Sequence, residues 1–219
     1  MSLPSEATPD FPFRPTPIKR MKWTHHFQMW SPKLGRRLSL YSRRAVEFWA
    51  MLESHAEILT FCELPGFICV DQNWRIADFV LRQAGGDQFI VLEGKALSAI
   101  EDAEEPALDP LPIVEISDSA LNAHRIRIDN WLQILPYITS NLPFLTSEFL
   151  SHVEDGLALP KPLVTIERDA LPADPMLTRT AVFELTRRGK LIGCDLESCP
   201  LSPRTSFVRV EHGNRTHDG

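Results

Sequence analysis

The apolar residues between positions 58 and 95 come in short runs separated by turn signals, and this pattern predicts a β-meander. The runs are rich in β-branched and aromatic residues, and Pro65-Gly66, Asp71 to Asn73 and Gly85-Gly86 interrupt them. Strands are therefore expected near 58–63, 66–70, 74–82 and 87–95, with one more at 113–117 (IVEIS).

Apolar residues at helical spacing occur on both sides of this meander. In the stretch SRRAVEFWAMLESHAEIL they are Val46, Phe48, Trp49, Leu52 and Ile58. Ser39 and Ser42 are both good N-cap residues for this helix, and the sequence does not choose between them. A second helix is expected over about 119–139.

The last third of the chain predicts a winged-helix domain. Thr146 caps a helix that Gly156 ends, and Asp174-Pro175 begins a helix that Gly189 closes. The segments KLIGCDLE and RTSFVRVE follow as a two-stranded ribbon. Residues 129–219 contain nine Lys or Arg and twelve Asp or Glu, so we expect this domain to bind protein and to read DNA poorly.

Charge is distributed unevenly along the chain. Residues 1–46 carry a formal charge of +7, whereas the whole chain carries −6. Residues 1–22 are rich in proline and have no apolar period, so they are expected to form an extended or disordered arm. Such an arm suits an acidic partner such as DNA, although a solvated basic tail without a partner is the alternative. The acidic segment EDAEEPALDPLP is expected to be a solvated loop.

Composition is that of an ordinary globular protein. The chain has 219 residues, of which 43% are hydrophobic and 24% charged. No apolar run approaches the roughly 20 residues of a transmembrane helix, and the N-terminus lacks the apolar core of a secretory signal. The four cysteines show no CxxC spacing, which favours a reduced cytosolic location. There is no GxGxxG, P-loop or GxSxG motif.

One predicted hairpin carries charges among its apolar residues. If its loop is Ala84 to Asp87, Asp78 faces Glu93, and Lys95 lies on the same face. Opposed carboxylates suit Mg²⁺ or Mn²⁺, and a lysine beside the metal can orient or deprotonate a water. The pattern therefore fits phosphodiester hydrolysis, although a cross-strand ion pair is the common alternative.

A third acid lies on the helix before the meander. Glu47 could point at the charged face of the hairpin, or it could pair with Arg43 or Arg44 on its own helix. Glu53 and Glu57 are rival acids on the same helix.

These segments together resemble the TnsA-like transposon endonucleases, which join a PD-(D/E)xK nuclease domain to a C-terminal winged-helix domain. The resemblance covers most of residues 31–210 and rests on a helical Glu and on the segments ADFVL, FIVLEGKA, IVEISDSAL, IDNWLQILPYI and AVFELTRRGKLIGCDLESCPLSPRTSFVRV. It implies an α/β (α+β) fold with a mixed sheet flanked by helices. The implied division is a basic Pro-rich arm (1–30), a nuclease-like domain (31–128), a winged-helix domain (129–212) and a tail (213–219).

The resemblance also implies roles for individual residues. Glu47, Asp78 and Glu93 would hold Mg²⁺, with Mn²⁺ as a substitute, and Lys95 would serve the attacking water. The best-known members carry Gln where Glu93 stands here. Five basic residues would hold phosphates near the cut, namely Lys33, Arg36, Arg37, Arg43 and Arg44.

The implied activity is cleavage of the 5′ strand at transposon ends. The implied partners are double-stranded DNA, a DDE-type transposase that cuts and joins the 3′ ends, and an AAA+ ATPase regulator, with no membrane. Such a subunit would work in the bacterial cytoplasm, at the nucleoid when active, and would show little sequence-specific binding alone. The alternatives are a restriction- or repair-type nuclease, a non-catalytic DNA- or protein-binding adaptor, and a winged-helix regulator.

Overall fold

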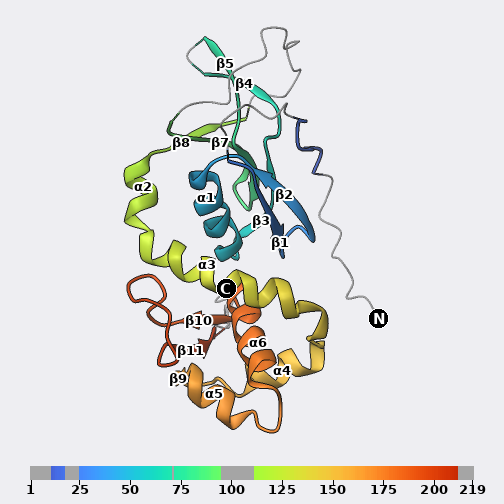
Figure 1. The fold of residues 1–219 in the computed structure, drawn as a ribbon, viewed down its shortest axis with the longest axis vertical. Coiled ribbons are helices and arrows are strands. Elements are labelled where there is room, and N and C mark those ends of the chain that lie inside the picture. The colour runs from blue at the N-terminus through green and yellow to red at the C-terminus, as the bar shows by residue number, and fades with distance from the viewer. Residues whose placement is uncertain (1–10, 18–24, 71, 95–110, 212–219) are drawn as a thin grey trace, which may run out of the picture. The chain divides into compact units, whose positions relative to one another are not determined.

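The computed structural model describes residues 11–17, 25–70, 72–94 and 111–211, and the chain divides into two compact units (Figure 1). Unit 1 contains the chain up to Ala123 except Ser54–Ala56, and unit 2 contains those three residues and the chain from His124 onward. The domain boundary predicted between residues 128 and 129 falls inside the helix α3 (Arg125–Asn141). Lys95 and most of the predicted acidic loop lie outside the described residues.

The described residues up to Ala123 form a mixed sheet, two ribbons and two helices. In chain order the elements are β1 (Phe27–Ser31), β2 (Arg36–Leu40), α1 (Arg43–Ser54), β3 (Ile58–Glu63), β4 (Phe67–Val70), β5 (Asn73–Ile76), β6 (Phe79–Gln83), β7 (Gly86–Leu92), β8 (Ile113–Ile116) and α2 (Asp118–Ala123). The sheet has the order β3-β6-β7-β8, with β7 and β8 parallel and the other pairs antiparallel. A mixed sheet flanked by helices is therefore confirmed.

The strand predicted over 74–82 is in fact two strands. β5 pairs with β4 in a separate ribbon, whereas β6 lies between β3 and β7. The backbone changes partner at the junction, because the N–H of Ala77 donates to Gly66 O at 3.0 Å and that of Asp78 donates to Ile90 O at 3.0 Å. Asp78 therefore lies in the bend between the two strands.

Helix α1 covers one face of the sheet. Ser42 caps it, since its Oγ accepts from Ala45 N at 3.0 Å, whereas Ser39 lies within β2. The rings of Phe48 and Phe79 lie 5.3 Å apart, which joins the buried side of α1 to β6.

The described part of the predicted N-terminal arm packs against the sheet. Phe11 and Phe13 contact a core cluster that includes Val80 and Phe89, and the rings of Phe13 and Phe89 lie 5.8 Å apart. Thr16 N donates to Leu64 O at 2.8 Å. The alternative of a disordered arm is therefore wrong for residues 11–17, because Phe11 and Phe13 are partly buried against the sheet and Thr16 is hydrogen-bonded to Leu64.

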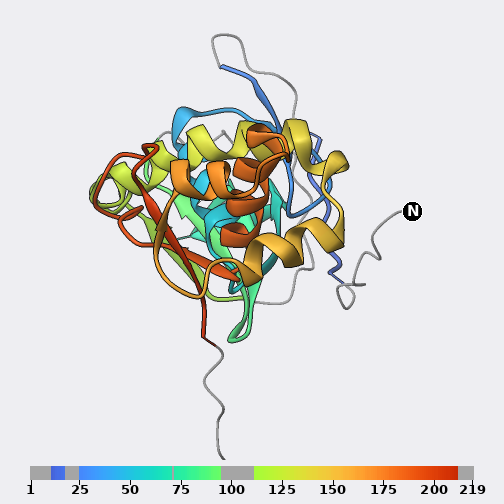
Figure 2. The ribbon, with the colours of Figure 1, turned by 90° about the horizontal axis from the view of Figure 1, so that it is seen from below.

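Unit 2 is built around helix α6. Its elements in chain order are α3 (Arg125–Asn141), η1 (Leu142–Phe144), α4 (Ser147–Asp155), β9 (Lys161–Pro162), α5 (Leu163–Asp169), α6 (Pro175–Arg187), β10 (Leu191–Gly193) and β11 (Ser206–Arg209). Helix α6 contacts α3, α4, α5 and β10, and Figure 2 shows it running beside α3. The three strands form an antiparallel sheet with β11 in the centre.

Most predicted boundaries in unit 2 are confirmed. Thr146 Oγ1 accepts from Phe149 N at 3.1 Å, and Asp174 Oδ1 accepts from Met176 N at 2.8 Å, so both predicted caps form. The helix expected over 119–139 is instead α2 and α3, separated at His124. Helix α5 and strand β9 were not predicted. No helix in the described residues is long and apolar enough to cross a membrane.

Candidate metal and DNA site

Asp78, in the bend just before β6, is held by the backbone of the neighbouring strand. Its Oδ2 accepts a hydrogen bond from Leu92 N at 2.8 Å and lies 3.5 Å from Nη2 of Arg75. Burial raises the pKa of this carboxyl, while the Leu92 hydrogen bond and the charge of Arg75 oppose that shift. These contacts place the carboxylate beside the last residue of β7.

The hairpin register differs from the prediction. Gln83 pairs with Gly86 and Phe79 with Ile90, so the connection is the two-residue turn Ala84-Gly85 and not a four-residue loop. Two-residue turns match the twist of a β-hairpin, and Gly86 adopts a φ of +113° that favours glycine. Asp78 therefore does not directly face Glu93. The observed register differs from the predicted one by two residues, so each side chain still lies on the face of the hairpin that was predicted for it.

Glu93 follows β7 and joins this strand to the start of α2. Its Oε2 accepts from Asp118 N at 2.7 Å, and its N–H donates to Ile116 O at 2.9 Å. Arg44 binds the same place, because its guanidinium donates to the Glu93 carbonyl and forms an ion pair with Asp118. Arg44 also lies against Gly94, where an added Cβ would collide with its Nη1.

Two residues of this cluster were missed in the sequence. Asp118 belongs to a segment that predicted only a helix start, and Arg75 belongs to a strand without any evident site motif. The pattern of apolar and polar residues around Asp118 and around Arg75 does not indicate which side chains these two residues contact. The contacts of Asp118 with Arg44 and Glu93 join chain segments far apart in the sequence, whereas Arg75 pairs with Asp78, three residues along the chain.

Glu47 lies on α1 and is nearly buried, with 8% of its surface exposed. Its Oε1 forms an ion pair with Nε of Arg43 at 3.0 Å, which is the alternative that its helical position allowed. It also follows Arg44 by three residues, so the two lie on the same side of the helix. The structure thus places Glu47 one turn beyond the residue that contacts Glu93.

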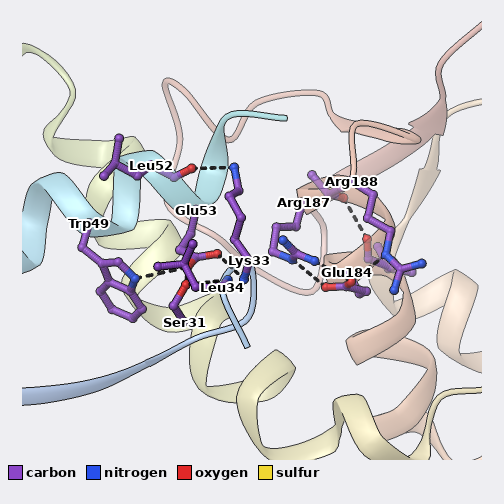
Figure 3. A network of polar contacts seen from close by, with 11 residues as sticks. Ser31, Lys33, Leu34, Trp49, Leu52, Glu53, Glu184, Arg187 and Arg188 are labelled. Carbon is purple, nitrogen blue, oxygen red and sulfur yellow. Dashed lines mark hydrogen bonds and ion pairs between the residues drawn. The ribbon is translucent and has the colours of Figure 1, made fainter. Parts of the chain in front are cut away.

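The rival acid Glu53 has a structural role. It is completely buried, and its carboxylate accepts from Ser31 Oγ, from Lys33 N at 3.2 Å and from Trp49 Nε1 at 3.2 Å (Figure 3). These contacts fix the turn between β1 and β2 onto α1. The other rival, Glu57, is exposed in the loop after the helix.

The five predicted phosphate-binding residues differ in whether their side chains already bind other groups of the protein. Lys33 Nζ donates to Leu52 O and Ile58 O, both at 2.8 Å. Arg36 binds Glu63 through two hydrogen bonds of 2.8 and 2.6 Å, which raise the pKa of its guanidinium. Arg43 and Arg44 pair with the acids described above. Arg37 is exposed, and no partner for its guanidinium is found within the described residues.

The carboxylates near the end of β7 provide some, but not all, of the ligands that a magnesium ion needs. No group of three or more His, Cys, Asp or Glu that could hold a metal occurs in the described parts of the chain. Magnesium, however, is commonly bound by one or two carboxylates together with waters and substrate phosphates. The contacts above engage Oδ2 of Asp78 and Oε2 of Glu93, and each carboxylate has a second oxygen that can ligate a hard cation.

No family model matches the chain, and no curated protein matches it either.

Proposed function

We propose that this protein is a metal-dependent DNA endonuclease subunit of a heteromeric transposase, which hydrolyses the 5′ strand at transposon ends. The observation that carries the proposal is the hydrogen bond from Leu92 N to the Asp78 carboxylate, which brings Asp78 beside the residue that precedes Glu93. Two carboxylates at the end of one strand pair, on a mixed sheet, suit a divalent cation that activates water against a phosphodiester.

Each residue of the proposed site has a separate task. Asp78 and Glu93 would ligate Mg²⁺, and Glu47 would complete the set from α1. Lys95 would orient the attacking water and balance charge on the phosphate as the transition state forms. The metal would supply a water of lowered pKa and a positive charge beside the leaving oxygen.

The order of elements in unit 2 supports a winged-helix domain as part of this proposal. Helix α4, β9, helices α5 and α6, then β10 and β11 follow one another, and β11 lies between the other two strands. Helix α6 would be the recognition helix, yet it contacts α3 and its residues Thr178 to Leu185 are buried apart from Arg179. A covered helix cannot enter a groove, so we assign unit 2 to partner proteins.

The partners belong to the same proposal. We propose that a DDE-type transposase and an AAA+ regulator supply most of the sequence specificity, and that double-stranded transposon ends are the substrate. Since its substrate is chromosomal DNA, we place the protein in the cytoplasm and at the nucleoid when active.

A second candidate is a non-catalytic DNA-binding adaptor. The ion pair of 3.5 Å between Arg75 and Asp78 favours it, because an arginine already supplies the positive charge that a metal would bring. In that case the carboxylates would only fix the chain at the end of β7.

Cleavage of a transposon-end duplex in Mn²⁺ separates the two functions. The assay would compare the natural chain, mixed with its transposase, with Asp78→Asn and Lys95→Ala. Both variants are expected to bind DNA normally and to lose 5′-strand cleavage by at least about a hundredfold. Glu115→Gln, an exposed acid on β8, is the matched control and should cleave normally. Full cleavage by Lys95→Ala would contradict its role, and the absence of 5′-strand cleavage by the natural chain with its transposase would favour the adaptor.

A further inference from the structure

The β1–β2 ribbon has one buried and one open face. Its register pairs Gln28 with Ser39 and Trp30 with Arg37. Because side chains alternate along a strand, these four residues share one face of the ribbon. The opposite face is closed, since Leu38 and Leu40 are 1% and 2% exposed.

The open face is rich in aromatic and hydrogen-bonding groups. Trp30 is 44% exposed, and Gln28 and Arg37 are exposed as well. At the end of the ribbon the rings of His26 and Tyr41 stack 5.0 Å apart at an interplanar angle of 8°. Nε2 of His26 lies 3.2 Å from Ser39 Oγ, which continues this row of polar groups.

The chain segment that contains this ribbon carries charge of a single sign. Residues 11–46 contain nine Lys or Arg and neither Asp nor Glu. Lys33 and Arg36 are bound internally, as described above, whereas Arg37 is exposed on the open face, which it shares with the uncharged residues Gln28, Trp30 and Ser39. A face of this kind complements a polyanion.

We propose that the open face of the β1–β2 ribbon (Gln28, Trp30, Arg37 and Ser39) binds duplex DNA by lying in its major groove. The groove, about 12 Å wide, admits a two-stranded ribbon. Gln and Arg are the side chains that bind adenine and guanine edges with two hydrogen bonds, and Ser can bind either. Trp30 adds apolar contact beside them. The inference rests on the proposed function only for its premise that the chain meets DNA.

Duplex DNA fits this face better than a single strand does. Single-strand binding depends on aromatic platforms on which successive bases stack. Here His26 and Tyr41 stack on each other, so Trp30 is the ring left to offer a face. The remaining side chains carry hydrogen-bonding groups, which suit base edges and phosphates.

The test is DNA binding by the full chain, measured by fluorescence anisotropy with a labelled transposon-end duplex and with its single strands. The test variant is Trp30→Ala with Arg37→Ala. The matched control is Trp74→Ala with Arg168→Ala, which removes an exposed Trp (41%) and an exposed Arg side chain (72%) elsewhere. Thermal melting of both variants checks that each is folded.

The ribbon variant is expected to bind the duplex at least about tenfold more weakly than the natural chain, while the control binds normally. Equal duplex affinities of the ribbon variant and the control would overturn the inference and leave the nuclease proposal standing. A loss confined to single strands would overturn it in favour of base stacking on Trp30. If the natural chain binds no duplex, with or without Mn²⁺, the shared premise fails and both proposals fall.

Discussion

Glu53 provides a test of whether the buried acids of α1 stabilise the fold or serve chemistry. We predict that Glu53→Ala destabilises the protein by about 3–5 kcal/mol. The substitution would leave three donors without their acceptor, namely the buried Ser31 Oγ and Trp49 Nε1 and the part-buried Lys33 N (Figure 3).

The magnitude follows from these contacts. A buried donor without a partner costs about 1–3 kcal/mol, and two buried donors and one part-buried donor are affected here. Water that enters the space left by the side chain would bind some of these donors. The total loss of stability is therefore expected near the lower end of the summed range. A loss of about 3–5 kcal/mol is a large share of the roughly 5–15 kcal/mol that stabilises a typical domain.

Urea unfolding followed by tryptophan fluorescence measures the effect. Glu57→Ala is the matched control, because Glu57 is an exposed acid in the loop after the same helix and should change stability by less than about 0.5 kcal/mol. Glu53→Gln keeps the shape and one acceptor, so its loss should be intermediate. Equal stability of the Glu53→Ala and Glu57→Ala variants would refute the structural role of Glu53.

Three further predictions concern stability. Burial acts to raise the pKa of Glu184, but Arg187 and Arg188 hold it below its ordinary value (Figure 3). Its ionised form therefore stabilises the fold above the unfolded pKa of about 4.3, and this contribution is lost as the pH falls through the folded pKa. The stability advantage of the natural chain over Glu184→Gln should shrink between about pH 6 and 3, and a constant difference would contradict this. Asn130→Ala should cost about 2–4 kcal/mol and speed proteolysis of the loop after β10, because Asn130 is buried and bonds the backbone of Leu196, Cys199 and Leu201; an unchanged digestion rate would count against it. Phe13→Ala should lower the free energy of unfolding by about 1–2 kcal/mol, since the ring packs on Phe89, and no change would mean that the arm contributes nothing.

Much of the fold could be predicted from local patterns. The strands β3 and β7, the helix α6 and the caps Thr146 and Asp174 follow from periodicity and capping chemistry, which depend on neighbouring residues alone. The β1–β2 ribbon was not predicted from the sequence, because its charged residues obscure the alternation of apolar and polar positions that is typical of a strand. Arg36 lies on the same side of the ribbon as Leu38 and Leu40, where its half-buried guanidinium binds Glu63, a residue of β3.

The candidate site could be predicted only in part. The sequence brings Asp78 and Glu93 onto one hairpin, but it gave the wrong turn length and hence the wrong facing pair. The ion pair of Arg44 with Asp118 joins α1 to α2, two helices separated by the whole sheet in the sequence. Contacts of this kind depend on how elements pack, which no local pattern encodes.

The central claim is that Asp78 and Glu93 form a metal site, and Mn²⁺ titration calorimetry tests it most directly. The natural chain would be compared with Asp78→Ala and Glu93→Ala, and with Glu115→Ala as a control for the loss of one exposed acid, each with and without duplex DNA. We predict binding by the natural chain and by the control, and its loss in both site variants. Mn²⁺ binding that survives both substitutions, or that is absent at millimolar metal even with DNA present, would contradict the claim.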